Sequence, residues 1–568
     1  MKIVFLAANC SYSHTNLAAW CLRTGVNESI WDWQTLEVTV KESPANVLAQ
    51  IMDAKPDVVA ATLYLFNHDF VAGLFGLLRE LRPECRLVVG GPECLGSVEA
   101  LAGMGGWADV AVRGEGELAL PELLERWRTG RDWMDIPGLC GVDAQGVFRD
   151  NGSTLFVEDF DSIPPFYDRE LVGFRKPFIQ LETSRGCANG CLFCTSRHTA
   201  RRIHSLDRVR NDLRAIAAAG VKDVRIVDRT FNEDRIRAVA LVRIFRDEFP
   251  GIRFHLEIEP ARFGRTLAEE FAVAEPGRFH LEVGIQSLAP DVCMTIQRGA
   301  TITRTLDGLK RLCDLKNIEV HVDLIAGLPG SRLVDIIADL EKVMVFRPAE
   351  IQLERLKLLP GTPLAQDPGR WGIVSRAAPP YQVLHTATIS AEDLEQSDRL
   401  SKLIDWYYNT KELHVFFADA IVIDSSFLTR FEEWIRQRMS FDKRPSLESR
   451  FESLYAFFQT EITGQVASSG ALELVAYRLC YRWFRLGFSA RNGLRPAVLL
   501  KKGVPQDAVL VEGDSTARVA RSWRVDIDMP YLFCYGTGAG GERSVVAVYQ
   551  LFNALRAEKA VDDGGIAV

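Results

Sequence analysis

The sequence lacks several features that would place it in whole classes of protein. It has no run of about 18 apolar residues, so we expect no membrane-spanning helix. Basic residues are not in excess, and the net charge of −8 excludes a general affinity for nucleic acid or an anionic membrane. The opening "MKIVFLAANC" is too short and lacks the cleavage site of a signal peptide. We therefore expect a cytoplasmic protein with no nucleic-acid or membrane partner.

Cysteine is also scarce. Twelve cysteines in 568 residues are too few for a disulfide framework, so we expect reduced thiols. Three of them are nevertheless crowded into "GCANGCLFC", where Cys187, Cys191 and Cys194 have the spacing C-x3-C-x2-C. The other nine stand singly, so no second C-x-x-C pair is present to complete a structural zinc site.

Three thiols without an obvious fourth ligand are informative, because iron and zinc sites in proteins usually have four ligands. Three ligands and one open position suit a four-iron–four-sulfur cluster whose open iron binds a substrate or cofactor. Two alternatives remain. One is a zinc site completed by a histidine such as His198, and the other is a set of buried free thiols.

Strand-like and helix-like segments alternate over residues 1–150. Continuous apolar runs at 2–8, 57–66, 86–91 and 109–114 are typical of buried parallel strands, and the segments between them have helical spacing. We therefore predict an α/β domain with a doubly wound parallel sheet. In such sheets the ligand site lies beyond the carboxyl ends of the strands.

A second strand–helix alternation follows a proline-containing linker at 151–175. Six strand-like runs separated by helical segments lie between residues 176 and 365, which predicts a partial (β/α)6 barrel with its site at the carboxyl ends of the strands. The cysteine cluster comes directly after the first of these runs. Residues 366–568 predict a mixed, mainly helical C-terminal domain with a probable role in substrate binding or as a lid. In it the aromatic run "DWYYN" (405–409) is better explained by core packing than by a pocket.

The motif C-x3-C-x-aromatic-C after the first strand of a six-unit barrel resembles the radical S-adenosylmethionine (SAM) superfamily. The resemblance implies that the three cysteines hold a 4Fe-4S cluster and that Phe193 fills the aromatic position. The family's glycine-glycine-glutamate pattern is absent, because the second strand ends in "IVDRTFN". Alternation puts Glu282 and Gln286 on one face of the fourth strand. The positions expected to bind SAM are Phe193, Asp228, Glu257, Glu259, Glu282, Gln286, Arg298, placed near the SAM carboxylate, and Gly327, near the adenine.

The amino-terminal section resembles the cobalamin-binding domain that precedes the barrel in one class of radical SAM enzymes. The similarity lies in "VVAATLYLFN" (58–67), "LVVGGPE" (87–93) and "ADVAVRGEGE" (108–117). The Asp-x-His-x-x-Gly motif of mutase-like cobalamin proteins is absent. His14 and His68 lie at strand ends and could approach the cobalt. A lone histidine in a loop is, however, more often a surface residue than a metal ligand. The resemblance implies a cobalamin site at Ser11, Tyr12, Ser13, Thr62, Tyr64, Phe66, Asn67, Gly90, Gly91, Pro92, Glu93, Gly114, Glu115 and Gly116.

Together the two resemblances imply a cobalamin-dependent radical SAM enzyme with a 4Fe-4S cluster, SAM and cobalamin as cofactors. The implied reaction is methylation of an unactivated carbon or phosphorus, through methylcobalamin and a 5′-deoxyadenosyl radical. The implied partners are a small-molecule or peptide substrate and an external electron donor of flavodoxin or ferredoxin type. The alternatives are a non-methylating cobalamin radical SAM reaction, a radical SAM enzyme without cobalamin, and a non-catalytic iron–sulfur or cobalamin sensor.

Overall fold

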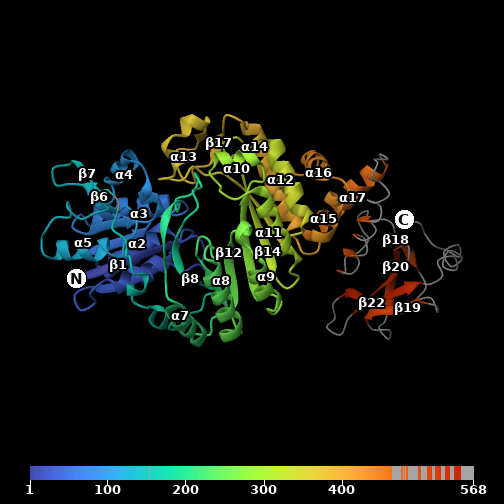
Figure 1. Ribbon diagram of the computed structural model, residues 1–568, viewed down its shortest axis with the longest axis horizontal. Helices are drawn as coiled ribbons and strands as arrows, with labels where there is room; N and C mark the ends of the chain where they lie inside the picture. The colour runs from blue at the N-terminus through green and yellow to red at the C-terminus, as the bar shows by residue number, and fades with distance from the viewer. Residues whose placement is uncertain are drawn as a thin grey trace. The chain divides into compact units, whose positions relative to one another are not determined.

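The computed structural model describes residues 1–152, 154–463, six positions between 475 and 486, and strands at 497–500, 508–513, 519–525, 531–537 and 543–551. The chain divides into two compact units. Unit 1 comprises Met1–Ile336 with Glu354–Glu395, and unit 2 comprises Ile337–Leu353 with Gln396–Val568. The first sheet, the cysteine cluster and all but the last strand of the second sheet belong to unit 1. Figure 1 shows the elements along the chain.

The first sheet of unit 1 has seven strands in the order β2-β1-β3-β4-β5-β6-β7. Its first five strands along the chain run parallel, and β6 and β7 are added antiparallel at one edge. The strands are β1 (Lys2–Asn9), β2 (Asp32–Thr39), β3 (Val58–Thr62), β4 (Arg86–Gly90), β5 (Val110–Val112), β6 (Leu139–Val142) and β7 (Phe148–Asp150). The order reverses at β1, so the carboxyl ends of β1 and β3 form the switch point at which such sheets bind ligands.

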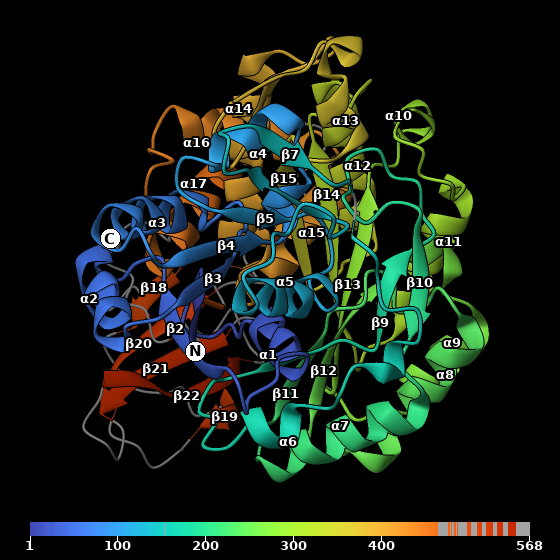
Figure 2. The same ribbon diagram turned by 90° about the vertical axis from the view of Figure 1, so that its left-hand side faces the viewer.

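Helices cover both faces of this sheet, as Figure 2 shows. Alternate residues of β1, such as Val4 and Leu6, share a core with Ile51 and Phe75 from the helices of one face. The helices are α1 (Leu17–Thr24), α2 (Pro44–Ala54), α3 (His68–Leu81), α4 (Val98–Met104) and α5 (Ala119–Arg128). The alternation of strand residues between two covered faces explains why the central strands are apolar throughout.

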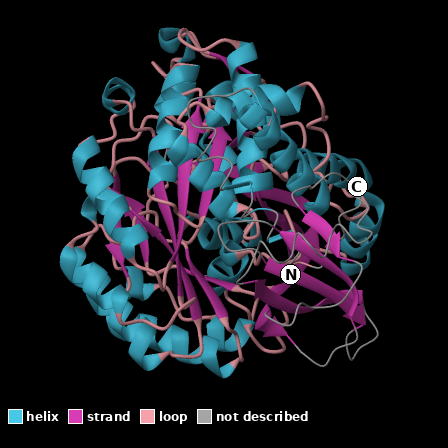
Figure 3. Cartoon of the chain, turned by 90° about the vertical axis from the view of Figure 1, so that its right-hand side faces the viewer, coloured by secondary structure: helices cyan, strands magenta, loops and turns pink. Residues whose placement is uncertain are grey.

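The second sheet is the predicted partial barrel. Strands β8 (Ile179–Leu181), β11 (Asp223–Ile226), β12 (Arg253–Ile258), β13 (Phe279–Gln286) and β14 (Glu319–Ala326) lie side by side in parallel, and β15 (Glu350–Arg355) is its sixth strand. Helices lie along the outer side of these strands (Figure 3). They are α7 (Leu206–Ala218), α8 (Arg235–Arg243), α9 (Arg265–Ala272), α10 (Pro290–Thr295), α11 (Ile302–Asp314) and α12 (Leu333–Val345).

Shorter elements join these layers. A hairpin of β9 (Ser184–Cys187) and β10 (Thr199–Ile203) follows β8 and carries the cysteine loop between its strands. Before β8 lies α6 (Tyr167–Glu170). After β15 come α13 (Pro363–Gln366) and a small hairpin of β16 (Val374–Ser375) and β17 (Val383–His385).

Unit 2 has a helical core and a separate antiparallel sheet. Its aromatic run is buried: the Tyr408 hydroxyl donates to the carbonyl of Pro348 at 2.9 Å, and the hydroxyls of Tyr407 and Ser453 lie 2.7 Å apart. This is core packing, as the sequence suggested. The helices are α14 (Ala391–Leu403), which begins in unit 1, α15 (His414–Ile423), α16 (Phe427–Arg436) and α17 (Leu447–Thr463). The sheet order is β18-β20-β21-β22-β19, with β18 (Ala497–Leu500), β19 (Ala508–Gly513), β20 (Val519–Val525), β21 (Tyr531–Thr537) and β22 (Arg543–Leu551).

The predicted fold class is confirmed, although the sequence pattern missed several strands. β2 lies at a sheet edge and alternates polar with apolar residues, so it has no continuous apolar run. The β9–β10 hairpin also has no continuous apolar run, because its strands are short and mostly polar. The exact domain boundaries predicted from the sequence stay predictions. Within the described part of the chain, none of the helices has the length and apolarity needed to cross a membrane.

Candidate functional site

The three clustered cysteines lie on the loop that begins at the end of β9. Cys187 and Cys191 are buried and Cys194 is partly exposed. Backbone geometry shapes the loop at Gly186, where φ is +102° and a Cβ atom would come within 2.4 Å of the carbonyl oxygen of Ala200. Only glycine fits there without strain. The loop is thus held by the hairpin in a conformation that brings three thiols to the carboxyl end of the barrel's first strand.

An arginine from the segment after α10 contacts the cysteine loop. The Arg298 guanidinium donates to Cys191 Sγ at 3.7 Å and to Glu259 Oε2 at 2.7 Å, and it also donates to the carbonyl of Gly284. Burial raises the pKa of the Cys191 thiol, and the positive charge of Arg298 opposes that rise. Arg298 therefore favours the thiolate form, which is the form that binds iron.

The segment that follows β11 fixes one wall of the site. Asp228 is fully buried, and its carboxylate accepts four hydrogen bonds from the backbone amides and hydroxyls of Thr183 and Ser184, at 2.5–2.9 Å. Thr230 Oγ1 lies 3.5 Å from Cys187 Sγ. Asp228 thus ties the β8–β9 junction to the end of β11 with both of its oxygens engaged, and its SAM-binding role stays a prediction.

The inner face of the barrel is lined with titratable side chains. Burial raises the pKa of Glu257 to about 7, and the nearby charge of Arg229 opposes that rise. Burial, followed by the negative charge of Glu282, raises the pKa of Asp323 to about 8. His255 Nε2 lies 2.8 Å from Glu282 Oε2, which lowers the pKa of Glu282. These groups give the barrel interior a polar surface that can hold ribose hydroxyls or an ammonium group.

The expected alternation along β13 is present. Glu282, Gly284 and Gln286 fall on the partly exposed inner face, and the residues between them are buried against the outer layer. A β-bulge lies between Gly284 and Gln286, and Gln286 has φ +69°. Gly327 has φ +87° immediately after β14. Gln286 and Gly327 therefore lie at the carboxyl ends of two neighbouring strands, where the sequence predicts that SAM binds.

At the first sheet, glycine geometry also shapes the strand ends. Gly91 follows β4 with φ +103°, and a Cβ atom there would lie 2.7 Å from the Leu63 carbonyl oxygen and 2.8 Å from Thr62 Cγ2. Asn67 is buried. Its side chain accepts from the Tyr64 amide at 2.8 Å and donates to the carbonyls of Ala8 and Thr62, each at 2.9 Å. Asn67 therefore binds the ends of β1 and β3 together.

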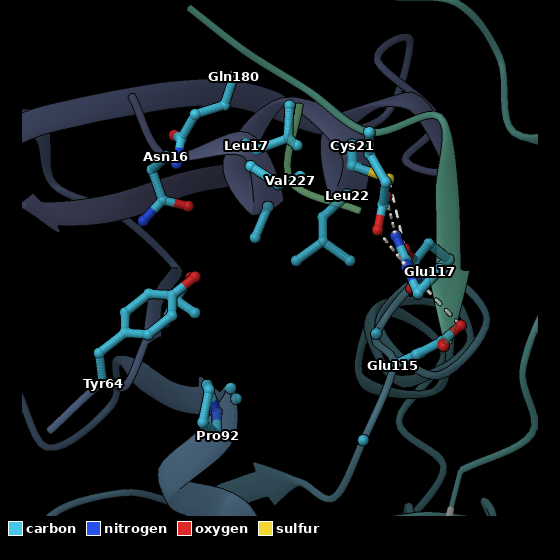
Figure 4. A pocket seen from close by; sticks show the side chains of 18 of the residues that line it. Asn16, Leu17, Cys21, Leu22, Tyr64, Pro92, Glu115, Glu117, Gln180 and Val227 are labelled. Atoms are coloured by element: carbon cyan, nitrogen blue, oxygen red, sulfur yellow. Dashed lines mark hydrogen bonds and ion pairs between the residues drawn. The ribbon is translucent and has the colours of Figure 1, made fainter. Parts of the chain in front are cut away.

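A single cavity of about 760 Å³ joins the two sets of strand ends within unit 1. Its first-sheet wall includes Thr62 and Gly90, and its barrel wall includes Arg185 and Glu257. Figure 4 shows Tyr64 and Pro92 across the open space from Asn16, Leu17 and Gln180, with Glu115 and Glu117 at one end. The volume is within the range of about 300–1,000 Å³ that is usual for ligand and cofactor sites.

The cavity extends between one face of the first sheet and helix α1. Phe5, Ala60, Val88 and Val112 from the sheet face line it together with α1 residues such as Leu22. An apolar slot between a sheet and its covering helix suits a buried aromatic or aliphatic group better than an exposed charge. This arrangement fits the nucleotide tail that the resemblance to cobalamin-binding domains implies.

The cavity residues only partly coincide with the predicted cobalamin contacts. Nine predicted residues line it: Thr62, Tyr64, Phe66, Gly90, Gly91, Pro92, Gly114, Glu115 and Gly116. Five are not among its lining residues: Ser11, Tyr12, Ser13, Asn67 and Glu93. Glu93 is buried and accepts a hydrogen bond from the Tyr381 hydroxyl. His14 lines the cavity as well, whereas His68 does not.

A network of partly buried charges, which the sequence did not predict, lines the cavity. Arg185 donates to Glu182 through two nitrogens, at 2.8 and 2.9 Å, and to Glu117 at 2.7 Å, and it lies 3.1 Å from Glu115. Arg202 also pairs with Glu115. The network joins β9 to the loop after β5, so the cysteine hairpin is attached directly to the first domain.

The residues at both ends fit the implied groups. Three thiols, two of them buried, lie within eight residues beside a cationic side chain, which is a suitable donor set for an iron–sulfur cluster. The first-sheet end offers glycines, an apolar slot and few free charges. Cys187, Cys191 and Cys194 would hold the cluster, and the nine cavity-lining residues of the first sheet would face cobalamin.

Comparison with known proteins gives the same two parts in the same order. Residues 3–124 match the B12 binding domain family, and residues 181–343 match the radical SAM superfamily. The chain therefore has the domain order of the cobalamin-dependent radical SAM family. Both matches agree with the predicted cluster, SAM and cobalamin. Residues 369–482 match a third family, described only as a protein of unknown function (DUF4080).

Individual relatives cover the chain only in part. An uncharacterised methyltransferase of Pyrococcus horikoshii is 28% identical over 45% of this chain and 57% of its own length. The hopanoid C-3 methylase of Methylococcus capsulatus is 31% identical over 32% of this chain and 36% of its own length. This chain thus covers less than two thirds of each of these relatives.

A solved structure shares the fold over a longer stretch. The cobalamin-dependent SAM radical enzyme OxsB, solved with aqua-cobalamin and SAM bound, covers 84% of this chain and aligns over 78% of its own. The TM-score is 0.60 and the sequence identity 14%, so this likeness concerns the fold.

Proposed function

We propose that this chain is a cobalamin-dependent radical SAM methyltransferase that acts on an unactivated carbon, or phosphorus, of a small molecule or peptide. The observation that carries the proposal is the shared cavity. Thr62 and Gly90 from the cobalamin side line the same space as Arg185 and Glu257 from the barrel side. A substrate in that space would face both cofactors at once. The proposed reaction requires this, because the substrate would lose a hydrogen atom on one side and receive a methyl group from the other.

The bound cofactors would supply the one-electron chemistry and the methyl transfer. The protein's own residues position them. Cys187, Cys191 and Cys194 would ligate the cluster, and Arg298 holds its charge against Cys191 and Glu259. The acids Glu257 and Glu282 and the amide of Gln286 would offer hydrogen-bonding groups to SAM. Tyr64 and Phe66, whose rings are stacked 5.3 Å apart, are at the cavity wall and limit the access of water.

Reconstitution tests the proposal. The chain is loaded with iron, sulfide and hydroxocobalamin under nitrogen, and metals are counted. About four irons and one cobalt per chain are expected. SAM labelled in its methyl group, an electron donor of flavodoxin type and an extract of candidate substrates then test for labelled product.

Each part of the proposal has its own contrary result. Four irons without cobalt would indicate a radical SAM enzyme without cobalamin. Both metals with 5′-deoxyadenosine but no labelled product would indicate a non-methylating reaction. Both metals without any cleavage of SAM would indicate a sensor. Cys313→Ala is the control, because this thiol lies on α11 away from the cluster loop.

A further inference from the structure

Arg229 stands out among the charged residues that line the cavity. The other arginines that line it have carboxylate partners within the described residues: Arg185 with Glu182 and Glu117, Arg202 with Glu115, and Arg208 with Asp212. Arg229 is exposed and lines the cavity, and its guanidinium has no hydrogen bond or ion pair among the residues that the structure describes. A guanidinium carries its charge at every physiological pH, so a ligand is the natural source of a counter-charge.

Hydrogen bonds anchor the backbone on both sides of Arg229. Asp228, one residue before it, accepts four hydrogen bonds from Thr183 and Ser184. After it, the Phe231 amide donates to the Glu257 carbonyl at 2.9 Å. Asn232 exchanges two 2.9 Å hydrogen bonds with the backbone of Glu259. A fixed base reduces the conformational entropy that the side chain loses when it binds a ligand.

The cavity lining places Arg229 where the two sheets meet, and groups from both sheets respond to its charge. It lowers the pKa of Glu257 on β12 against the rise that burial causes. It acts in the same direction on Tyr64, which belongs to the first domain and whose pKa burial raises. Arg229 thus lies between the carboxyl ends of the two sheets, where a molecule in the shared cavity passes.

We propose that Arg229 is a specificity-determining residue that binds a carboxylate or phosphate group of the substrate. The inference rests on the proposed function and adds a substrate class to it, namely an anionic molecule. The planar fork of a guanidinium matches a carboxylate or phosphate through two parallel N–H···O bonds. The carboxylate of SAM has the same chemistry. The family resemblance places Arg298, not Arg229, near that carboxylate, and the measurement of SAM binding described below distinguishes the two anions.

The test compares anion binding with SAM binding. The reconstituted protein, without reductant, is dialysed at pH 8 against labelled inorganic pyrophosphate and, separately, against labelled SAM. The variants are Arg229→Gln and Arg229→Lys, with Arg235→Gln as the matched control. Arg235 is an exposed arginine at the start of α8 and does not line the cavity.

We expect Arg229→Gln to weaken pyrophosphate binding about ten- to a hundred-fold, the usual effect of losing a charge-assisted pair. Arg229→Lys should restore part of the affinity, and Arg235→Gln should match the wild type. SAM affinity should stay unchanged in all three. Glu257→Gln should tighten pyrophosphate binding, because it removes a negative charge near Arg229.

Two results would overturn the inference. Equal pyrophosphate affinity in wild type and Arg229→Gln would show that Arg229 does not hold an anion. Loss of SAM affinity in Arg229→Gln would assign the anion to SAM instead of to the substrate. Either result leaves the metal counts and the methyl transfer untouched, so failure of the proposed function would be recognised separately.

Discussion

The two parallel sheets of unit 1 present different surfaces at their carboxyl ends. The first sheet ends in glycines and apolar side chains, with Gly91 in a conformation that requires glycine and with Ala60 and Val88 beneath. The barrel ends in carboxylates and imidazoles on its inner face, among them Glu257 and Glu282. The difference matches the expected ligands, since a large and mostly apolar cofactor needs space and close backbone approach, whereas SAM carries charges that need partners.

A second difference concerns how the two ends are built. The cluster ligands come from one loop of eight residues, whereas the first-sheet end is assembled from loops after four strands. Substitutions in the cysteine loop should therefore abolish binding of the iron–sulfur cluster and leave cobalamin binding intact. Substitutions at the end of the first sheet should have the opposite effect. The following experiments test this separation, from the largest expected effect to the smallest.

The largest effect is expected from the cysteines. Cys187→Ala, Cys191→Ala and Cys194→Ala should each bring the iron count from about four per chain to near zero, because three thiolates are the minimum ligand set for the cluster. Bound cobalt should stay near one per chain. Metal analysis after reconstitution measures both. Retention of iron in any single variant, or a loss of cobalt together with iron, would contradict independent sites.

Arg185→Met should have the next largest effect. It leaves the partly buried carboxylates Glu182 and Glu117 without their cation, which should cost about 3 kcal/mol, the low end of the range for a buried pair. We expect a lower midpoint of chemical unfolding and impaired loading of both cofactors, because Arg185 joins the cysteine hairpin to the first domain. Arg265→Met is the control. It breaks a surface pair with Glu269 whose side chains are 90% and 59% exposed, and it should change stability by less than about 1 kcal/mol.

Gly91→Ala should reduce stability by roughly 1–3 kcal/mol, since a Cβ atom would collide with the Leu63 carbonyl and the backbone would be strained at positive φ. Cobalamin retention should fall while the iron count stays the same. Gly73→Ala is the matched control on the exposed side of α3, where a Cβ atom meets nothing within 4 Å. That change should be neutral or stabilising by up to about 1 kcal/mol. Equal effects of the two substitutions would contradict the close approach at Gly91.

The most gradual effect is a dependence on pH, which changes stability by at most about 1.4 kcal/mol for each pH unit. The folded pKa of Asp323 is about 8, above its unfolded value, because of burial and the charge of Glu282. The folded state therefore holds a proton that the unfolded state releases, and the free energy of unfolding should decrease as pH rises from about 4 to about 8. Asp323→Asn should flatten this decrease in the cofactor-free protein. An unchanged slope in the variant would assign the dependence to other groups, such as Glu257.

The sequence predicted the elements whose patterns are local. The apolar run around Val4 and Leu6 identified a buried parallel strand, and the spacing of Cys187, Cys191 and Cys194 identified the thiol loop. Alternation on β13 correctly placed Glu282 and Gln286 on one face, because neighbouring residues of a strand point to opposite sides whatever the surroundings. β2 and the β9–β10 hairpin escaped prediction because half of their residues are polar.

The tertiary structure alone decided which polar groups are free. Asp228, Asn67 and Glu93 have residue types and positions that suit cofactor contacts, yet each is engaged by groups brought close only by folding, up to 288 residues away for Glu93 and Tyr381. Arg185 and Arg229 are both arginines at strand ends in the sequence. Packing gives Arg185 three carboxylate partners and leaves Arg229 at the cavity wall. A sequence specifies which groups can bind, but their partners depend on distances through space, which only the folded chain sets.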